Sequence, residues 1–328
     1  MSKKFDNKIL LYILGALIIV FGAVKLYQKK YTENTLNPKI VDIDTAKVTK
    51  LLLYPTSEKR AEIKFYKEGK EWEISKDKLI AEPEGNVVQN LLGMLLEIKV
   101  QRLAARGKSK MAELLLNDTS ATRVKVYQGD KLALDLLIGK FSYQKGNNPY
   151  SGMYGGGTGT SYVRLADKEE AYAVEGFLTF SFNQQFNSFR KQTLARFDKP
   201  SATKITFKYP ADSSFVVELK DKQWMIGSEK ADSAKVADYL NSLAYKNASS
   251  FNDNFVPSGA SQCQLTVEGN NMKTITIDAY FLMNDNYILN SNQNPKSYFS
   301  SPNKGLLSEV FKGKKTFFGD DKKSKKKK

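Results

Sequence analysis

The same order of local features occurs twice in this chain of 328 residues, and this repetition restricts its fold more than any other property. Residues 49–55 and 203–210 are short apolar runs that end at Tyr-Pro, as strands do where proline removes a backbone donor. The two tryptophans, Trp72 and Trp224, each follow a strand-like run and a turn rich in Gly, Lys or Asp. Each copy therefore begins with a predicted hairpin whose second strand carries the tryptophan.

A helix-period segment follows each tryptophan hairpin. Its apolar residues recur at helical spacing in both copies: Val88, Leu91, Leu92, Leu95 and Ile98 in the first, and Val236, Leu240, Leu243 and Ala244 in the second. Alternating runs around Gly129-Asp130 and Gly269-Asn270 then predict a further hairpin in each copy. The expected fold class is α+β, with tandem duplicated antiparallel sheet-plus-helix repeats after one N-terminal transmembrane helix.

The expected boundaries follow from this pattern. The first α+β repeat covers residues 45–175 and the second covers 201–311, with a connecting helix over 176–200. That helix carries phenylalanines at 177, 180, 182, 186 and 189, which we expect to be buried because large aromatic side chains usually are.

The chain begins with a tail (1–8), followed by the apolar run ILLYILGALIIVFGAVKL. As a helix these 18 residues would measure about 27 Å, close to the thickness of a hydrocarbon core. We therefore predict a transmembrane anchor over 9–27, followed by a linker over 28–44. The predicted anchor residues are Ile9, Leu14, Ile18, Phe21 and Leu26. A cleaved signal peptide is the alternative, although it would have a shorter apolar region and a small-x-small site.

Lys3, Lys4 and Lys8 precede the apolar run, and Lys25, Lys29 and Lys30 lie at its end or after it, so the positive-inside count does not orient it. A short tail before one span favours a body outside the cytoplasm. The expected location is the bacterial inner membrane, with one span and most of the chain in the periplasm.

Composition excludes several kinds of chemistry. The chain has no histidine, which excludes Ser-His-Asp and Cys-His nucleophiles and histidine-ligated zinc. Its one cysteine cannot form an intramolecular disulfide. The net charge of +16 is concentrated at the ends, with +5 in residues 1–30 and +7 in residues 312–328. The nearly balanced body argues against nucleic-acid binding, and no motif predicts a cofactor, a metal site or catalytic residues.

A long connection rich in Gly, Asn, Ser and Tyr joins the strand ending at Gly139 to the strand-like run SYVRL. It lacks the lysine and the following helix that a phosphate-binding loop requires. It is therefore predicted to be a hairpin loop, and long loops of this kind are often functional. The residues proposed to contact a partner are Tyr143, Tyr150, Tyr154 and Gly156.

The Lys-rich end, residues 312–328, is predicted to be a disordered tail. Its lysines either attract an anionic surface or form a solvated end. The residues proposed for an anionic surface are Lys322, Lys323, Lys325 and Lys328.

The order of these features resembles the bacterial "domain of unknown function 4340" family. The resemblance is carried by LDLLIGK (134–140), by SYVRL with AYAVEG (171–176), and by RKQTLARFDKPSATKITF (190–207), and it extends over about residues 45–300. The resemblance implies a membrane-anchored envelope protein without an assigned activity. Some family members occur beside, or fused to, components of ABC-type transport systems related to gliding motility.

These observations together favour a non-enzymatic, single-pass envelope protein. It would be a binding, scaffolding or accessory subunit of a membrane complex, of the ABC-transport type, with protein partners and the membrane as contacts. One alternative is a carboxylate-based cell-wall hydrolase, which needs two acids at a suitable separation in space. Another is a glycan- or cargo-binding module, which needs exposed aromatic side chains beside a groove.

Overall fold

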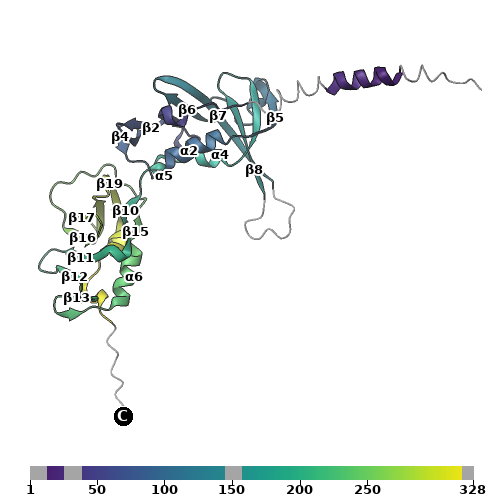
Figure 1. Ribbon diagram of the computed structural model, residues 1–328. Helices are drawn as coiled ribbons and strands as arrows, with labels where there is room; N and C mark the ends of the chain where they lie inside the picture. Colours follow the sequence, from purple (N-terminus) through teal and green to yellow (C-terminus); the bar gives the residue numbers. More distant parts are fainter. Residues whose placement is uncertain (1–12, 26–38, 145–156, 320–328) are drawn as a thin grey trace, which may run out of the picture. The chain divides into compact units, whose positions relative to one another are not determined.

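The computed structural model describes residues 13–25, 39–144 and 157–319 (Figure 1). The chain divides into two compact units. The first comprises residues 1–70 and 86–185, and the second comprises residues 71–85 and 186–328. Each unit is described by itself below.

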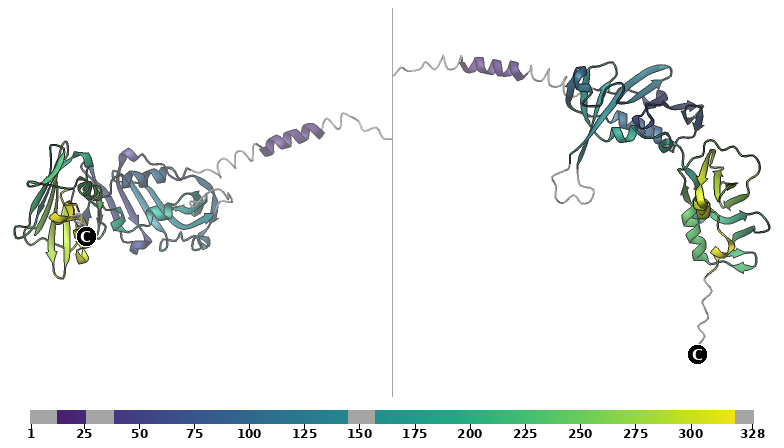
Figure 2. Two further views of the ribbon diagram at one scale, coloured as in Figure 1. Left: turned by 90° about the horizontal axis from the view of Figure 1, so that it is seen from below. Right: turned by 180° about the vertical axis from the view of Figure 1, so that it is seen from behind.

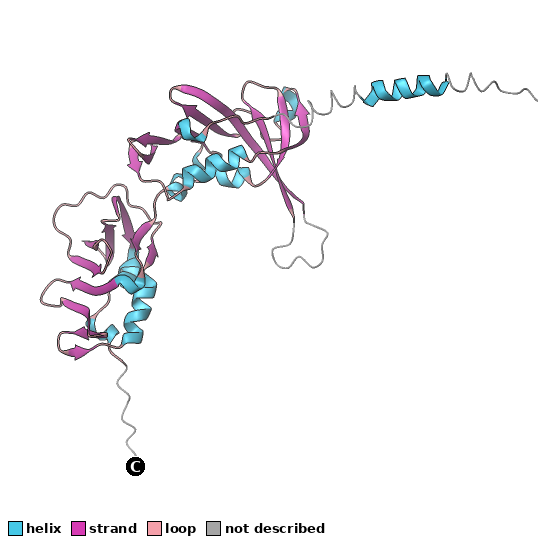
Figure 3. Cartoon of the chain, in the orientation of Figure 1, coloured by secondary structure: helices cyan, strands magenta, loops and turns pink. Residues whose placement is uncertain are grey.

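The described chain consists mostly of antiparallel strands in three sheets, of nine, two and eight strands (Figure 3). This finding contradicts the α+β class expected from the sequence. Apart from the N-terminal helix over residues 13–25, only the helices α2 (Val87–Leu96) and α6 (Ser233–Leu243) are longer than six residues among those the structure describes. The helices predicted from helical periodicity are present in these two segments, but most of the remaining regular structure consists of paired strands.

The largest sheet has the strand order β4-β3-β2-β1-β6-β7-β8-β9-β5. Its strands are β1 (Val48–Tyr54), β2 (Ile63–Glu68), β3 (Glu71–Lys76), β4 (Leu79–Ala81), β5 (Val100–Arg106), β6 (Thr122–Gln128), β7 (Lys131–Gln144), β8 (Thr158–Leu165) and β9 (Glu170–Glu175). By residue range, β3 and β4 belong to the second unit and the other seven strands to the first. The first unit also contains α2, α3 (Lys108–Met111), α4 (Leu178–Phe182) and the 3-10 turns η1 (Thr45–Lys47) and η2 (Thr56–Glu58).

The eight-stranded sheet of the second unit has the order β14-β13-β12-β11-β16-β17-β18-β19. Its strands are β11 (Ala202–Lys208), β12 (Phe215–Lys220), β13 (Gln223–Ile226), β14 (Glu229–Lys230), β16 (Cys263–Gly269), β17 (Ile275–Leu282), β18 (Asn286–Ser291) and β19 (Asn294–Ser301). A separate pair joins β10 (Thr193–Arg196) to β15 (Tyr245–Asn247). The remaining elements are α5 (Phe186–Phe189), α6, α7 (Gly305–Val310), η3 (Lys199–Ser201), η4 (Pro302–Lys304) and η5 (Lys314–Phe317).

Eight strands of the first sheet follow the same spatial order as the eight strands of the second. Trp72 lies in β3 and Trp224 lies in β13, which are the second strands of the two predicted tryptophan hairpins. The helices α2 and α6 occur at the same point of the two series, directly after β4 and β14. The turns and apolar runs read from the sequence therefore correspond to real hairpins.

The core of the second unit lies between its sheet and α6. Along β11, Ile205 and Phe207 are fully buried, and Val236 and Leu240 of α6 belong to the same apolar cluster. The helix starts at Asp232, whose carboxylate accepts hydrogen bonds from two backbone amides of the first turn at 2.9 and 3.3 Å. Such a cap satisfies donors that the helix cannot pair internally, and so it fixes where α6 begins.

The N-terminal apolar run forms a helix over residues 13–25, about 20 Å long at the usual rise per residue. Among the described residues, no helix is both long and apolar enough to cross a membrane, which contradicts the transmembrane helix predicted over 9–27. Of the predicted anchor residues, Leu14, Ile18 and Phe21 lie on this helix and are exposed, and Ile9 and Leu26 lie outside the described residues.

The helix expected over residues 176–200 is instead two short helices, α4 and α5, followed by the strand β10. Phe, Ser, Thr and Asn predominate in this stretch, and they are weaker helix formers than Ala or Leu. Three of its phenylalanines are buried as predicted: Phe182, Phe186 and Phe189. The other two, Phe177 and Phe180, are more than half exposed, at 52% and 55%.

Candidate functional site

The predicted hairpin around the Gly-rich connection is present in the first unit. The strands β7 and β8 pair beyond Gly139, as far as Gln144 opposite Thr158. Of the four predicted partner residues, Tyr143 lies on β7 with about half its surface exposed. Tyr150, Tyr154 and Gly156 lie outside the described residues. Of the predicted hairpin, the structure therefore describes the base, where β7 and β8 pair.

Two glycines at this base leave room for aromatic rings. A Cβ atom at Gly157 would lie 2.2 Å from the hydroxyl oxygen of Tyr143. At Gly159 it would lie 2.9 Å from the ring of Phe141 and 3.0 Å from the ring of Phe177. All three separations are shorter than van der Waals contact, so glycine at these two positions lets the aromatic side chains lie on the hairpin.

The rings above Gly159 form an aromatic patch, defined here as Phe141, Tyr143, Phe177 and Phe180. The ring centroid of Phe141 lies 5.2 Å from that of Phe177 and 4.7 Å from that of Phe180. The second pair is edge-to-face, with 72° between the ring planes, which is a favourable arrangement for aromatic quadrupoles. Phe141, Phe177 and Phe180 are thus mutually packed rings, and Tyr143 lies two residues further along the same strand.

Hydrogen bonds hold α4 beside the hairpin and so fix the patch. The hydroxyl of Thr179 donates to the carbonyl of Gly139 at 3.0 Å. The side-chain amide of Gln184 donates to the carbonyl of Phe180 at 2.6 Å and closes the end of the short helix. The two exposed phenylalanines are therefore presented on a rigid support, although water surrounds more than half of each.

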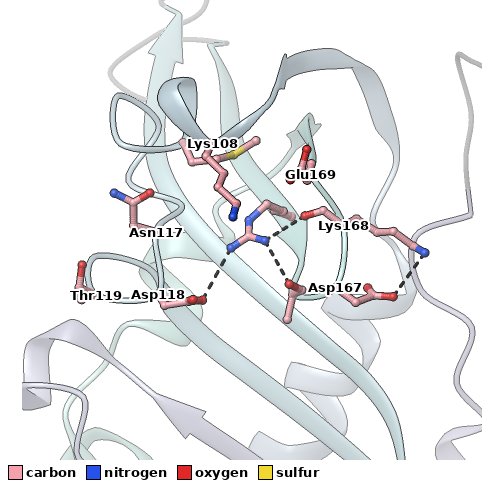
Figure 4. A pocket seen from close by; sticks show the side chains of 10 residues that line it. Lys108, Asn117, Asp118, Thr119, Asp167, Lys168 and Glu169 are labelled. Carbon is pink, nitrogen blue, oxygen red and sulfur yellow. Dashed lines mark hydrogen bonds and ion pairs between the residues drawn. The ribbon is translucent and has the colours of Figure 1, made fainter.

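A second candidate site in the first unit is a pocket of about 600 Å³ between α3, the following loop and the β8–β9 turn (Figure 4). Ten residues line it: Lys108, Met111, Asn117, Asp118, Thr119, Arg164, Ala166, Asp167, Lys168 and Glu169. In Figure 4 the ammonium group of Lys108 and the carboxylate of Asp118 point toward the middle of the pocket. The lining contains three basic and three acidic residues and is therefore nearly neutral.

Arg164, at the end of β8, is the centre of this pocket, and its side chain is only 13% exposed. Its guanidinium donates to the carbonyls of Lys168 at 2.9 Å, Ala166 at 3.1 Å and Leu116 at 3.2 Å. It also lies 3.7 Å from the carboxylate of Asp118. Because backbone carbonyls accept most of its hydrogen bonds, Arg164 fixes the β8–β9 turn and the loop before β6.

The pocket rests on a small apolar cluster that includes Met111, Leu116 and Leu137. Gly139 on β7 allows the loop after α3 to approach, since a Cβ there would lie 2.2 Å from the carbonyl oxygen of Leu114. That carbonyl accepts a hydrogen bond from the amide of Lys140 at 2.8 Å. The floor of the pocket is therefore held by backbone contact with β7.

Two of the three acids of this pocket lie beside cations. Asp118 lies beside Arg164, and Asp167 forms an ion pair with Lys168 at 3.3 Å. The arrangement can accept a small polar or zwitterionic group between Lys108 and the exposed carboxylates. Within the described residues, no group of three or more His, Cys, Asp or Glu side chains could hold a metal ion.

Sequence reasoning located only part of these sites. It singled out Tyr143, but expected Phe177 and Phe180 to be buried, and it did not identify Lys108 or Arg164. A single arginine at the end of an alternating strand carries no distinguishing signal, because its role depends on carbonyls of the β8–β9 turn and of the loop before β6. The proposed tail residues Lys322, Lys323, Lys325 and Lys328 lie outside the described residues.

The model of the family "Domain of unknown function (DUF4340)" matches residues 81–265 of this chain. This match covers more than half of the chain, which therefore belongs to the family. It confirms the resemblance over a shorter segment than the sequence patterns suggested. No curated protein and no solved structure matches the chain.

Proposed function

We propose that this protein is a non-enzymatic binding or scaffolding subunit of a bacterial membrane complex. The aromatic patch of the first unit is the surface that contacts a protein partner. The complex is of the ABC-transport type, as the family resemblance implies, and the two units lie on the periplasmic side of the inner membrane.

One observation supports this proposal most directly: the patch exposes clustered phenylalanines on a rigid support. Phe177 and Phe180 are 52% and 55% exposed, and both rings pack against Phe141. Aromatic side chains are enriched in protein interfaces, where burying one large ring contributes more than most other contacts. Exposed, contiguous apolar surface of this kind marks interaction sites.

The test compares co-purification of partners with two matched variants. The protein carries a tag at its carboxyl end, and native membranes are solubilised in mild detergent. The patch variant is Phe177→Ala with Phe180→Ala. The control is Phe281→Ala in the second unit, where the phenylalanine is 51% exposed and packs against Tyr287 with a centroid separation of 5.4 Å.

We expect the unmodified protein and the control to recover the same partner proteins. The patch variant should lose them, because removal of a central aromatic anchor typically costs about 2 kcal/mol or more of binding free energy. Recovery of a permease and its ATPase would identify the complex as an ABC-type transporter. Unchanged recovery with the patch variant would contradict the proposed contact, and recovery of no partner at all would contradict the subunit role.

A glycan- or cargo-binding function is the second candidate, and a pocket in the second unit favours it. This pocket, of about 330 Å³, is lined by Lys199, Pro200, Ala202, Leu219, Trp224, Ala237, Leu240 and Asn241. Trp224 is only partly buried, and Lys199 donates a hydrogen bond to Asn241 at the rim. An indole face beside polar groups suits a sugar ring. Quenching of tryptophan fluorescence by cell-wall glycans, lost in Trp224→Phe, would support this candidate, and no change with any glycan would oppose it.

A further inference from the structure

A pocket of about 580 Å³ lies in the second unit between α6 and the segment after α7. In Figure 2 the yellow C-terminal segment lies against the green helix α6, and η5 contacts this helix. The lining residues come from both elements: Lys235, Asp238, Tyr239, Ser242, Lys312, Lys315 and Thr316. This pocket is separate from the aromatic patch and from the pocket of Arg164, which belong to the first unit.

Buried aromatic side chains fix the C-terminal wall of the pocket. Phe317 is fully buried and Phe311 is 8% exposed, and both belong to the core of the second unit. The hydroxyl of Tyr239 donates to the carbonyl of Val310 at 2.7 Å and joins the middle of α6 to the same wall. The lysines of this segment therefore extend from a well-packed backbone, and its described part, residues 312–319, is not the disordered tail predicted over 312–328.

Hydrogen bonds hold both the backbone carbonyl and the side-chain ammonium of Lys312. Its carbonyl accepts a hydrogen bond from the hydroxyl of Tyr209 at 2.8 Å, and its ammonium donates to the carbonyl of Ser308 at 2.5 Å. The hydroxyl of Ser242 is used within α6, where it donates to the carbonyl of Tyr239 at 2.8 Å. The charge of the ligand that the pocket attracts therefore depends on its lysines and on Asp238.

Three lysines and one aspartate line the pocket, so its ionisable lining carries a formal charge of +2. The sequence that continues from this wall is also basic, with a net charge of +4 over residues 316–328. A cavity with excess charge of one sign raises the local concentration of the opposite ion. Lysine ammonium groups bind phosphate as compact charges without a fixed geometry.

We propose that this pocket binds a phosphate group through Lys312, Lys315 and Lys235. The same chemistry is presented by free inorganic phosphate and by the headgroup of an anionic phospholipid. This site is independent of the proposed protein partner, because it uses other residues and another unit.

The experiment uses the full chain and two variants with equal loss of charge. The pocket variant is Lys312→Gln with Lys315→Gln. The control is Lys222→Gln with Lys273→Gln, two lysines of strand-connecting turns in the same unit that do not line the pocket. One arm measures the rise in melting temperature with inorganic phosphate, against sodium chloride at equal ionic strength. The other measures sedimentation with vesicles of phosphatidylglycerol, against phosphatidylcholine.

We expect binding in at least one arm, weakened about fivefold per lysine and so about 25-fold in the pocket variant, with the control within about twofold of the unmodified protein. Binding of free phosphate identifies a soluble ligand. Binding to phosphatidylglycerol vesicles alone identifies a lipid headgroup. Equal loss in both variants would overturn the proposal, since it would reflect general surface charge. Binding in neither arm, or vesicle binding that survives the pocket substitutions, would also overturn it.

Discussion

Among the described residues, Arg190 has the largest side chain that is fully buried, and its environment shows how a charge can be part of a core. Its guanidinium forms two hydrogen bonds with the carboxylate of Asp253, at 2.9 and 2.8 Å. The Cζ atom of this group lies 3.8 Å from the ring centroid of Phe251 and 5.4 Å from that of Phe186. The pair thus connects α5 to the loop before β16.

Replacing Asp253 with asparagine should destabilise the second unit. Breaking a buried ion pair leaves one uncompensated charge, which costs about 3–5 kcal/mol of unfolding free energy. Both tryptophans belong to this unit, so urea unfolding followed by tryptophan fluorescence reports on it. The control is Glu229→Gln, which breaks an exposed pair with Lys314 and should change the free energy by less than about 1 kcal/mol. Equal effects of the two substitutions would contradict the structural role of Arg190.

Among the elements, β7 supports both candidate sites of the first unit. It extends over 14 residues, pairs with β6 and β8, and carries Phe141 and Tyr143 of the aromatic patch. Near its middle, Gly139 accepts a hydrogen bond from Thr179 of α4 and contacts the loop after α3. The position of this one glycine therefore determines how α4 and the Arg164 pocket are arranged around the strand.

Gly139→Ala should disturb this arrangement. The added methyl group would lie 2.2 Å from the carbonyl oxygen of Leu114, so the loop must move and the hydrogen bond from Lys140 must lengthen. We expect a loss of about 1–3 kcal/mol, the usual cost of overpacking, and faster hydrogen exchange in residues 112–121. Gly93→Ala in α2 is the matched control, because its Cβ meets nothing within 4 Å and alanine favours helices. Unchanged hydrogen exchange in Gly139→Ala would show that the close contact between Gly139 and Leu114 does not hold the loop in place.

At the scale of the whole molecule, both units contain acidic groups that are held in their neutral form. Burial raises the pKa of Tyr209, of Tyr239 and of the Cys263 thiol in the second unit. In the first unit, burial and then the hydrogen bond to Glu62 raise the pKa of Tyr54. Each of these groups ionises more readily in the unfolded chain than in the folded one. Their contribution to stability is therefore complete below the unfolded pKa and is lost as the pH rises above it.

The protein should accordingly lose stability at alkaline pH, beginning near the ordinary pKa values of 9.0 for cysteine and 10.0 for tyrosine. Above its unfolded pKa, each neutral group reduces the unfolding free energy by about 1.4 kcal/mol per pH unit. Melting temperatures measured from pH 8 to pH 11 should fall. The melting temperature should fall less steeply with pH in Tyr239→Phe than in the unmodified protein. In Tyr245→Phe, which replaces a tyrosine that is 66% exposed, it should fall as steeply as in the unmodified protein. A constant melting temperature from pH 8 to pH 11 would contradict the conclusion that burial keeps these groups neutral in the folded protein.

The sequence by itself determined the positions of hairpins and of the two long helices inside the units. Strands end at Tyr54 and Lys208, close to the two Tyr-Pro pairs, and turns occur at Gly69 and at Asp221-Lys222. These features depend on local chemistry: proline lacks a donor, and turn residues tolerate positive φ angles. The same patterns, in their order along the chain, were sufficient to recognise the family.

Only the tertiary structure decided the fold class, the exposure of Phe177 and Phe180, and the partners of Arg164 and Arg190. The sheets pair strands distant in sequence, such as β1 with β6, and a local pattern does not specify such partners. Burial is likewise decided by what another segment covers, so similar phenylalanines in one stretch have opposite exposures. The proposed phosphate pocket joins Lys235 to Lys312 and Lys315 through packing of the C-terminal segment on α6. Long-range contacts of this kind depend on the assembled core, because each needs the shape and position of both segments at once.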